Sequence, residues 1–219
     1  SAGYYVLYYN STSQTPCPVG TYQPSTGLSF CIDASPGNYV NTVAATAQVP
    51  CDIGSYQPLS GQDRCNVADS GYYVPITGSA NQTACDLGTF QPNPGSSSCL
   101  DSPPGHYVDT TGAISATPCS AGTYNTNVGS SSADSCIPSD PGNSVPADGA
   151  YFQTPCTPGH YQPSSGQISC LDADAGYYVA VHGASSQITC GLGTFNPDIA
   201  QSSCTDASPG HYVDTPAST

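Results

Sequence analysis

Twelve cysteines are the residues of this chain whose spacing most clearly indicates chemistry. The gaps between them alternate between 14 and 20 residues, with one gap of 17. An even number at regular spacing predicts disulfide bonds, which persist in an oxidising, extracellular setting. A zinc site is disfavoured, because no two cysteines stand two to four residues apart. The cysteines are Cys17, Cys31, Cys51, Cys65, Cys85, Cys99, Cys119, Cys136, Cys156, Cys170, Cys190 and Cys204.

Catalytic chemistry is not predicted, and we expect no enzyme. A catalytic site needs a nucleophile with its base, converging acids or a metal cage, and none of these patterns occurs. The four histidines have no short metal-ligand spacing, and three of them stand beside a recurring aromatic residue, so we expect exposed positions on hairpins. They are His106, His160, His182 and His211.

Aspartates recur two residues after a cysteine, at Asp33, Asp101, Asp172 and Asp206. The simplest interpretation is a turn in which the carboxylate accepts a hydrogen bond from a nearby backbone N–H. The alternative is a calcium ion held between repeats, since Ca²⁺ prefers carboxylate and carbonyl oxygens. We predict no cofactor, with calcium kept as that alternative.

Modification and assembly are indicated near the N-terminus. Asn10 and Asn81 each begin an acceptor sequence for N-linked glycans, so covalent glycans are expected. An exposed apolar run invites partner binding or strand addition. Such a run is predicted as an assembly interface and comprises Tyr4, Tyr5, Val6, Leu7, Tyr8 and Tyr9.

The composition excludes several partners. The chain has 219 residues, a net charge of -14 and one basic residue, Arg64. Nucleic acid and anionic membrane surfaces are therefore poor partners. No apolar segment reaches the ~18 residues of a transmembrane helix, so no membrane insertion is expected. With no basic-then-apolar leader at its start, the chain is expected to be mature or a fragment.

The elements that must position these residues follow a 34-residue period, which indicates an array of stacked units. Glycines mark it at Gly3, Gly37, Gly71, Gly105, Gly142, Gly176 and Gly210. The predicted repeats are 1–36, 37–70, 71–104, 105–141 with a three-residue insertion, 142–175 and 176–209, and then a partial repeat, 210–219.

The predicted fold class is small disulfide-rich repeats, with short β-hairpins and coil in an elongated rod and almost no helix. Tyr, Val and Thr flank turns rich in Gly, Pro, Asn and Ser, and Gly and Pro number 23 and 21. Each unit should touch only its neighbours. One aromatic residue about every 17 should form a spine, broken at Ser144, where Tyr151 compensates. The insertion within 119–136 is expected at a hairpin tip.

The half-repeat C-x-x-G-T-Y-x-P-x-x-G-x-S-x-C resembles the ephrin-receptor-like cysteine-rich repeat of the growth-factor-receptor and EGF-like class. In that family every half carries its own cysteine pair, in the pattern C-x-x-G-T-Y…G-A-S-S-C-x-x-C. Here alternate halves lose both partners together. Ala34, Ala68, Ser102, Ser139, Ala173 and Ala207 replace one cysteine, and Gln14, Gln48, Gln82, Ala116, Gln153 and Gln187 replace the other.

The resemblance therefore implies that the remaining cysteines pair in phase. The expected bonds are 17–31, 51–65, 85–99, 119–136, 156–170 and 190–204. The alternative joins Cys31 to Cys51 and Cys65 to Cys85, and it leaves Cys17 and Cys204 to link neighbouring subunits.

Function is predicted from repetition. The first hypothesis is an extracellular or cell-surface structural protein, a glycosylated subunit that self-associates head-to-tail into a surface fibre. The resemblance implies the same, since such repeats occur in surface fibres, including flagellar hairs. The alternative is the ectodomain stalk of a receptor or adhesin that binds a protein or glycan ligand.

Overall fold

The computed structural model describes residues 1–7 and 13–219, and their regular structure consists almost entirely of paired two-residue strands. Among these residues there is no α-helix, only the short 3-10 helix η1 (Ala133–Ser135). None of them forms a helix that could cross a membrane. The predicted class, small disulfide-rich β-hairpin repeats with almost no helix, is confirmed.

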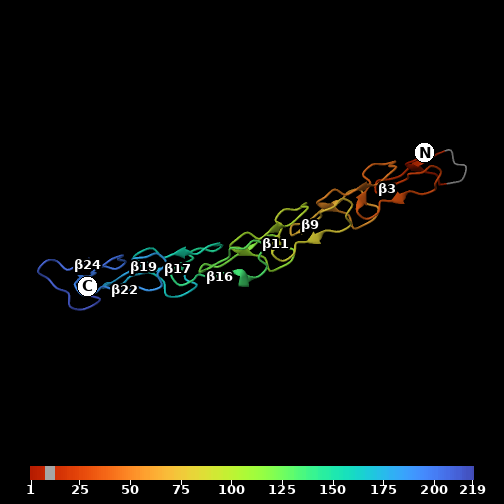
Figure 1. The fold of residues 1–219 in the computed structure, drawn as a ribbon. Coiled ribbons are helices and arrows are strands. Elements are labelled where there is room, and N and C mark those ends of the chain that lie inside the picture. The colour runs from red at the N-terminus through yellow and green to blue at the C-terminus, as the bar shows by residue number, and fades with distance from the viewer. Residues whose placement is uncertain (8–12) are drawn as a thin grey trace. The chain divides into compact units, whose positions relative to one another are not determined.

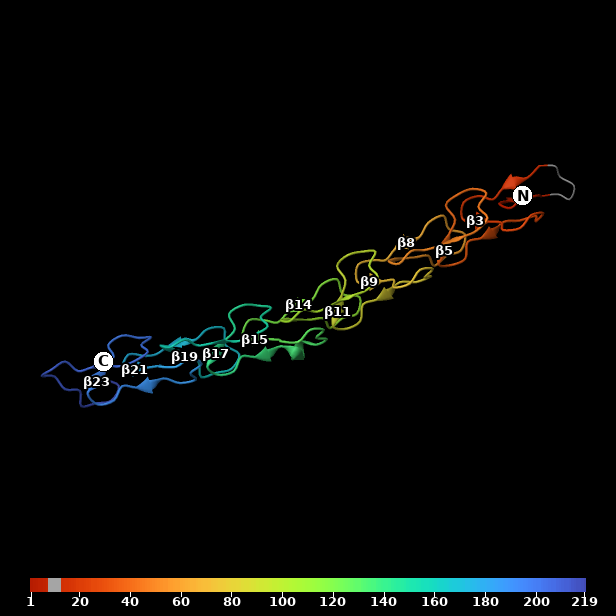
Figure 2. The same cartoon turned by 45° about the horizontal axis from the view of Figure 1, so that its top comes forward.

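The hairpins belong to two compact units. The first comprises Ser1–Asp101 and Thr110–Ser115, and the second comprises Ser102–Asp109 and Ala116–Thr219. Within each unit the hairpins follow one another in chain order (Figures 1 and 2).

All strand pairs are antiparallel and join consecutive strands. Those of the first unit are β1 (Tyr4–Tyr5) with β2 (Thr15–Pro16), β3 (Thr21–Tyr22) with β4 (Ile32–Asp33), β5 (Asn38–Tyr39) with β6 (Val49–Pro50), β7 (Ser55–Tyr56) with β8 (Asn66–Val67), β9 (Tyr72–Tyr73) with β10 (Thr83–Ala84), and β11 (Thr89–Phe90) with β12 (Leu100–Asp101).

The second unit continues the same series. Its pairs are β13 (His106–Tyr107) with β14 (Thr117–Pro118), β15 (Thr123–Tyr124) with β16 (Ile137–Pro138), β17 (Asn143–Ser144) with β18 (Thr154–Pro155), β19 (His160–Tyr161) with β20 (Leu171–Asp172), β21 (Tyr177–Tyr178) with β22 (Ile188–Thr189), and β23 (Thr194–Phe195) with β24 (Thr205–Asp206).

A tight turn leads into each hairpin, and its glycine has a positive φ; before β3 the glycine is required by space as well. In the turn before β3, the Thr21 N–H donates to the Pro18 carbonyl at 3.1 Å, and Gly20 has φ 82°. This is the position of a type II turn that favours glycine. A Cβ on Gly20 would stand 2.2 Å from the carbonyl oxygen of Gly61, so no side chain fits there.

Within each unit, a hairpin contacts the two hairpins that follow it, as the hairpin β3–β4 illustrates. The Gly20 N–H donates to the Val40 carbonyl of the following hairpin at 2.7 Å. The tip of the hairpin after that reaches back, and its Gly61 N–H donates to the Ala34 carbonyl at 2.8 Å. The expectation that each half-repeat contacts only its immediate neighbours was therefore wrong. The tip of a hairpin reaches past the adjacent hairpin and contacts the one before it.

The buried core consists of small side chains and amides. Its recurring members are a valine, the first cysteine of each pair, an alanine or serine in the other halves, and a glutamine or asparagine. The expected aromatic spine is not this core, because the motif aromatics in the strands, such as Tyr22 and Tyr73, are only half-buried. Nor does Tyr151 compensate for Ser144, since Tyr151 is 57% exposed.

The three-residue insertion lies just after a hairpin tip. Gly129 keeps the tip conformation, with φ 70°, and its N–H donates to the Ser102 carbonyl at 2.9 Å. The extra residues then form η1 on the arm that returns to β16, and the Ser132 side chain accepts from the Asp134 N–H at its start. The hydrogen bond between the Gly129 N–H and the Ser102 carbonyl is preserved, because the extra residues follow the hairpin tip and take no part in it.

Candidate functional site

Six disulfides close alternate hairpins. Each joins the residue before an entry turn to the residue before the second strand of the same hairpin, with Cα–Cα distances from 5.5 to 5.8 Å. The pairs are Cys17–Cys31, Cys51–Cys65, Cys85–Cys99, Cys119–Cys136, Cys156–Cys170 and Cys190–Cys204, which is the in-phase pairing. All twelve cysteines are bonded.

The cysteine-free hairpins are closed by a different device, which we call the glutamine clamp. In these hairpins a glutamine stands where the second cysteine of a pair would be, and an alanine or serine stands where the first would be. The glutamine side chain forms hydrogen bonds with the residue that follows this alanine or serine. Gln187 Oε1 accepts from the Asp174 N–H at 2.7 Å, and Gln187 Nε2 donates to Asp174 Oδ2 at 2.6 Å. Equivalent contacts join Gln82 to Asp69 and Gln153 to Asp140, and Gln48 bonds Ser35 in the same way.

The hairpin β13–β14 has neither closure. Ala116 stands where the glutamine would be, and it has no amide. Pro103 stands where the clamped residue would be, and proline has no N–H to donate. The hairpin depends on its strand pairing and on bonds such as that from the Cys119 N–H to the Gly105 carbonyl at 2.8 Å.

Buried amides hold the tips of the disulfide-closed hairpins. Gln57 is 3% exposed, donates to the Arg64 carbonyl at 2.7 Å and accepts from the Leu59 N–H at 3.1 Å. Gln23, Gln91 and Gln162 make the same two bonds. Of the two asparagines at this position, Asn125 donates to the Ser130 hydroxyl and accepts from the Asn127 N–H, and Asn196 donates to the Ser203 carbonyl. These residues were missed in the sequence, although an amide follows each motif aromatic of these halves where the other halves have valine.

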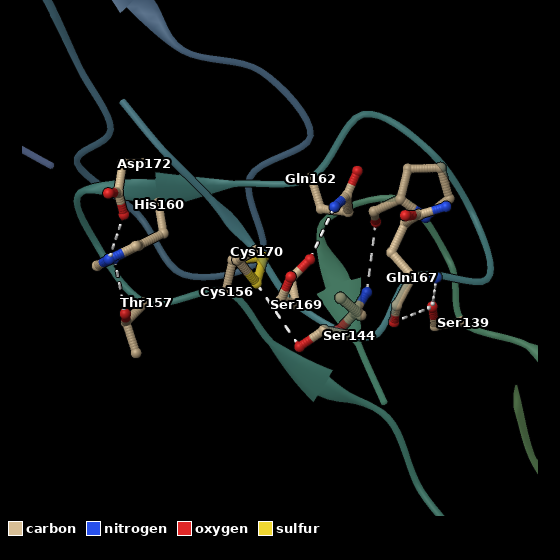
Figure 3. Close-up of a disulfide and its surroundings, with 12 residues drawn as sticks. Ser139, Ser144, Cys156, Thr157, His160, Gln162, Gln167, Ser169, Cys170 and Asp172 are labelled. Carbon is tan, nitrogen blue, oxygen red and sulfur yellow. Dashed lines mark hydrogen bonds and ion pairs between the residues drawn. A yellow bond between two sulfur atoms is a disulfide. The ribbon is translucent and has the colours of Figure 1, made fainter. Parts of the chain in front are cut away.

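One place departs from the repeat, around the Cys156–Cys170 disulfide. On β17 the motif aromatic is replaced by Ser144, which is 9% exposed. The Ser144 hydroxyl lies 3.7 Å from Cys170 Sγ, and Figure 3 shows the serine directed at the disulfide. A disulfide sulfur carries no hydrogen, so the hydroxyl is the donor.

The neighbouring hairpin β19–β20 carries a histidine bridge. His160 Nε2 lies 3.1 Å from Asp172 Oδ1 on the opposite strand, and His160 Nδ1 lies 3.2 Å from Thr157 Oγ1 (Figure 3). A hydroxyl, an imidazole and a carboxylate in this order are the residue types of a nucleophile, its base and the group that orients the base. His160 Nδ1 also lies 3.3 Å from the Pro158 carbonyl oxygen, which competes with the hydroxyl for this nitrogen. The histidine and aspartate side chains are 35% and 51% exposed, so solvent reaches the bridge freely.

The other candidate ligands do not converge. Among the described residues, no three His, Cys, Asp or Glu side chains are grouped as around a metal ion. His182 and His211 are exposed, but His106 and His160 are half-buried, which corrects the expectation of four exposed histidines. The recurring aspartates are second residues of strands rather than turn residues, at Asp33, Asp101, Asp172 and Asp206.

The described glycan and assembly residues lie on or after β1 and on the hairpin β9–β10. Asn81 is exposed on the arm leading to β10. Tyr4 and Tyr5 form β1 and are half-buried, and Leu7 is 64% exposed. Asn10, Tyr8 and Tyr9 fall outside the described residues.

Comparison with known proteins supports the family resemblance in the middle of the chain. Residues 71–119 match the family model described as "Tyrosine-protein kinase ephrin type A/B receptor-like". The match spans less than half of the chain and includes the Cys85–Cys99 disulfide. No curated protein matches the chain. This segment and the six disulfides fit an extracellular repeat protein.

Proposed function

We propose that this chain is a glycosylated structural subunit of a surface fibre, whose copies join head-to-tail outside the cell. The observation that carries the proposal is the periodic contact between hairpins. A turn glycine binds the next hairpin and receives the tip of the hairpin after that, and the same bonds recur along each unit. Hairpins of another copy can make these bonds equally well, because they use backbone groups.

Two surfaces are suited to this junction. In the first unit, a Cβ on tip glycine Gly27 would meet no atom within 4 Å, whereas the equivalent position on Gly61 lies 3.5 Å from Asp33. In the second unit, Gly193 likewise has open space, and a groove of about 290 Å³ is lined by Phe195 and Tyr212 among others. We assign the tip of hairpin β3–β4 of one copy to the hairpin β23–β24 of another, a heterologous contact that extends without closing.

The remaining features agree with a structural role. Exposed Asn81 offers a position for a glycan, and Asn10 is the second acceptor in the sequence. We assign no catalytic role to the histidine bridge, because electrostatic catalysis needs preorganised donors in a water-excluded site, and this bridge is open to solvent.

Electron microscopy of the unreduced protein tests the proposal. We expect filaments for the wild type, and loss of filaments for Leu7→Asp, since a charge at an apolar junction has to be desolvated. Val43→Asp is the matched control, because Val43 and Leu7 are both 64% exposed near hairpin tips. Separate wild-type molecules at high protein concentration would overturn the fibre proposal.

The family match favours a second candidate, a stalk in the ectodomain of a receptor or adhesin. A stalk requires the repeat contacts within one chain but no contact between copies. Unconnected molecules in the same micrographs, together with retained disulfides, would support this alternative.

A further inference from the structure

A groove opens in the first unit where the hairpin β5–β6 meets the hairpin β7–β8. Its volume is about 480 Å³, and its lining combines one aromatic ring with groups that donate or accept hydrogen bonds. Tyr39 provides the ring, and the polar groups belong to Asn41, Asp52, Ser55, Asp63 and Arg64. Sites for small molecules combine apolar surface with a few polar groups that fix the orientation of the ligand.

Three contacts fix the shape of this groove before any ligand binds. The Val40 N–H donates to the Gln62 carbonyl at 3.0 Å, which joins the end of β5 to the arm that leads to β8. The buried Gln57 side chain donates to the Arg64 carbonyl at 2.7 Å. The disulfide of hairpin β7–β8 ties the same arm to the turn before β7. A site held in this way loses little conformational entropy when a ligand binds.

The side chains of the groove retain bonding capacity for a ligand. Arg64 Nε lies 3.3 Å from Asp63 Oδ1, but the terminal N–H groups of Arg64 bond no described residue, and this side chain is 82% exposed. The amide of Asn41 and the carboxylate of Asp52 likewise have no partner among the described residues. The Ser55 hydroxyl donates to the Asp52 carbonyl at 2.7 Å and can still accept.

The same place in the other repeats lacks this set of groups. The groove beside Tyr107 in the second unit has a volume of about 200 Å³, and no charged side chain lines it. At the position of Arg64 the other disulfide-closed hairpins have Phe30, Ser98, Ser135, Ser169 and Ser203. At the position of Asn41 the other repeats have Leu7, Pro75, Asp109, Pro146 and Ala180. One repeat therefore departs from the series at several lining positions together, which the stacking of hairpins does not require.

The mixture of donors and acceptors matches the hydroxyl groups of a neutral sugar. A sugar hydroxyl both donates and accepts, so it can accept from Arg64 while it donates to Asp52 or Asp63. The C–H groups on one face of a hexose can pack on an aromatic ring, and the half-buried Tyr39 leaves part of its ring open to such contact. An anionic ligand fits less well, because two carboxylates line the groove with one guanidinium and the chain has a net charge of -14.

We propose that this groove binds a neutral hexose unit of a glycan. The guanidinium of Arg64 and the amide of Asn41 donate to the sugar hydroxyls, the two aspartates accept from them, and Tyr39 supports the ring. Binding of a sugar is a property beyond the structural role. It does not depend on fibre formation, because every lining residue belongs to one chain and to its first unit.

Saturation-transfer NMR on the unreduced full chain tests the proposal, with the methyl glycosides of glucose, galactose and mannose as probes. We expect transfer to the ring C–H protons of at least one of them, with a Kd of about 1 to 10 mM, since one sugar makes few contacts. Absence of transfer to all three at about 50 mM would overturn the proposal. Tighter binding of the methyl glycoside of glucuronic acid would also overturn it, because the groove would then be an anion site.

Arg64→Ser tests the donor. Serine already occupies the equivalent position at Ser169, where the Gln162 side chain still donates to the backbone carbonyl at 2.8 Å (Figure 3). The substitution should therefore preserve the hairpin and raise the Kd about fivefold or more, because the bonds from the guanidinium are lost.

Tyr39→Ser tests the ring, and it copies the residue type that the chain has at Ser144. It should raise the Kd about fivefold or more, because the sugar loses its apolar support. Tyr73→Ser changes the same strand position outside the groove and is the matched control, with an unchanged Kd. All variants are first checked for six intact disulfides by mass spectrometry. An unchanged Kd in both Arg64→Ser and Tyr39→Ser would show that the sugar binds elsewhere and that the proposal is wrong.

Discussion

At the scale of single residues, the turn glycines determine how closely two hairpins approach. Gly20 combines a positive φ of 82° with a backbone carbonyl in the space of its missing side chain. Gly27 has nearly the same φ, 78°, but open space around it. The two positions therefore separate the cost of backbone conformation from the cost of lost contact between hairpins.

We predict that Gly20→Ala lowers the free energy of unfolding by about 3 kcal/mol or more, because strain and a backbone clash add. Gly27→Ala should cost only about 1 kcal/mol, from the left-handed conformation alone. Thermal and denaturant unfolding of both variants measure the difference. Equal losses would show that the approach of the Gly61 carbonyl does not limit packing at Gly20.

At the scale of the hairpin, a disulfide closes one set of hairpins and a glutamine clamp closes most of the others. A disulfide around a loop of this length contributes about 3 kcal/mol in the chain-entropy model. A hydrogen-bonded clamp contributes about 1 kcal/mol per bond at most. The hairpin β13–β14 has neither, because Pro103 lacks the donor and Ala116 lacks the amide.

A double-mutant cycle at this hairpin tests the clamp. Ala116→Gln alone should leave stability nearly unchanged, since Pro103 offers no N–H. In the Pro103→Asp background, the same Ala116→Gln change should stabilise by about 1 kcal/mol, because both bonds of the clamp can form. Denaturant midpoints of the four proteins give the coupling. A coupling of zero would show that the clamps at Gln82, Gln153 and Gln187 are contacts without energetic effect.

At the scale of the whole molecule, each unit is held by repeated short-range contacts around a narrow core. The fully buried side chains are valines, cysteines, alanines and amides rather than large apolar residues. Such a core contributes little burial per repeat, so small disulfide-rich folds depend on their cross-links.

We therefore predict that reduction of all six disulfides by a phosphine at 25 °C abolishes the hairpin structure in both units. Circular dichroism before and after complete reduction and alkylation checks this, with an unreduced sample treated with the same alkylating agent as the control. An unchanged spectrum after complete reduction would show that the clamps and the backbone ladder suffice.

The amino-acid sequence by itself determined the period, the hairpin class and, for residues 1–7 and 13–219, the absence of α-helix. These depend on local properties: glycines at fixed intervals, turn-forming residues between short β-forming stretches, and cysteines spaced to close loops. The sequence also showed that Ser144 interrupts the series of motif aromatics, because every other repeat has a tyrosine or phenylalanine at this position.

Only the tertiary structure decided what fills the core, how far each hairpin reaches and what replaces the missing cysteines. The aromatics looked like a spine, yet Val40 and Gln23 are fully buried, because the close backbone approach at the glycines leaves room only for compact side chains. The glutamine clamp and the His160–Asp172 bridge join residues 13 and 12 positions apart. Their meeting depends on strand register, which a pattern of residue types does not specify.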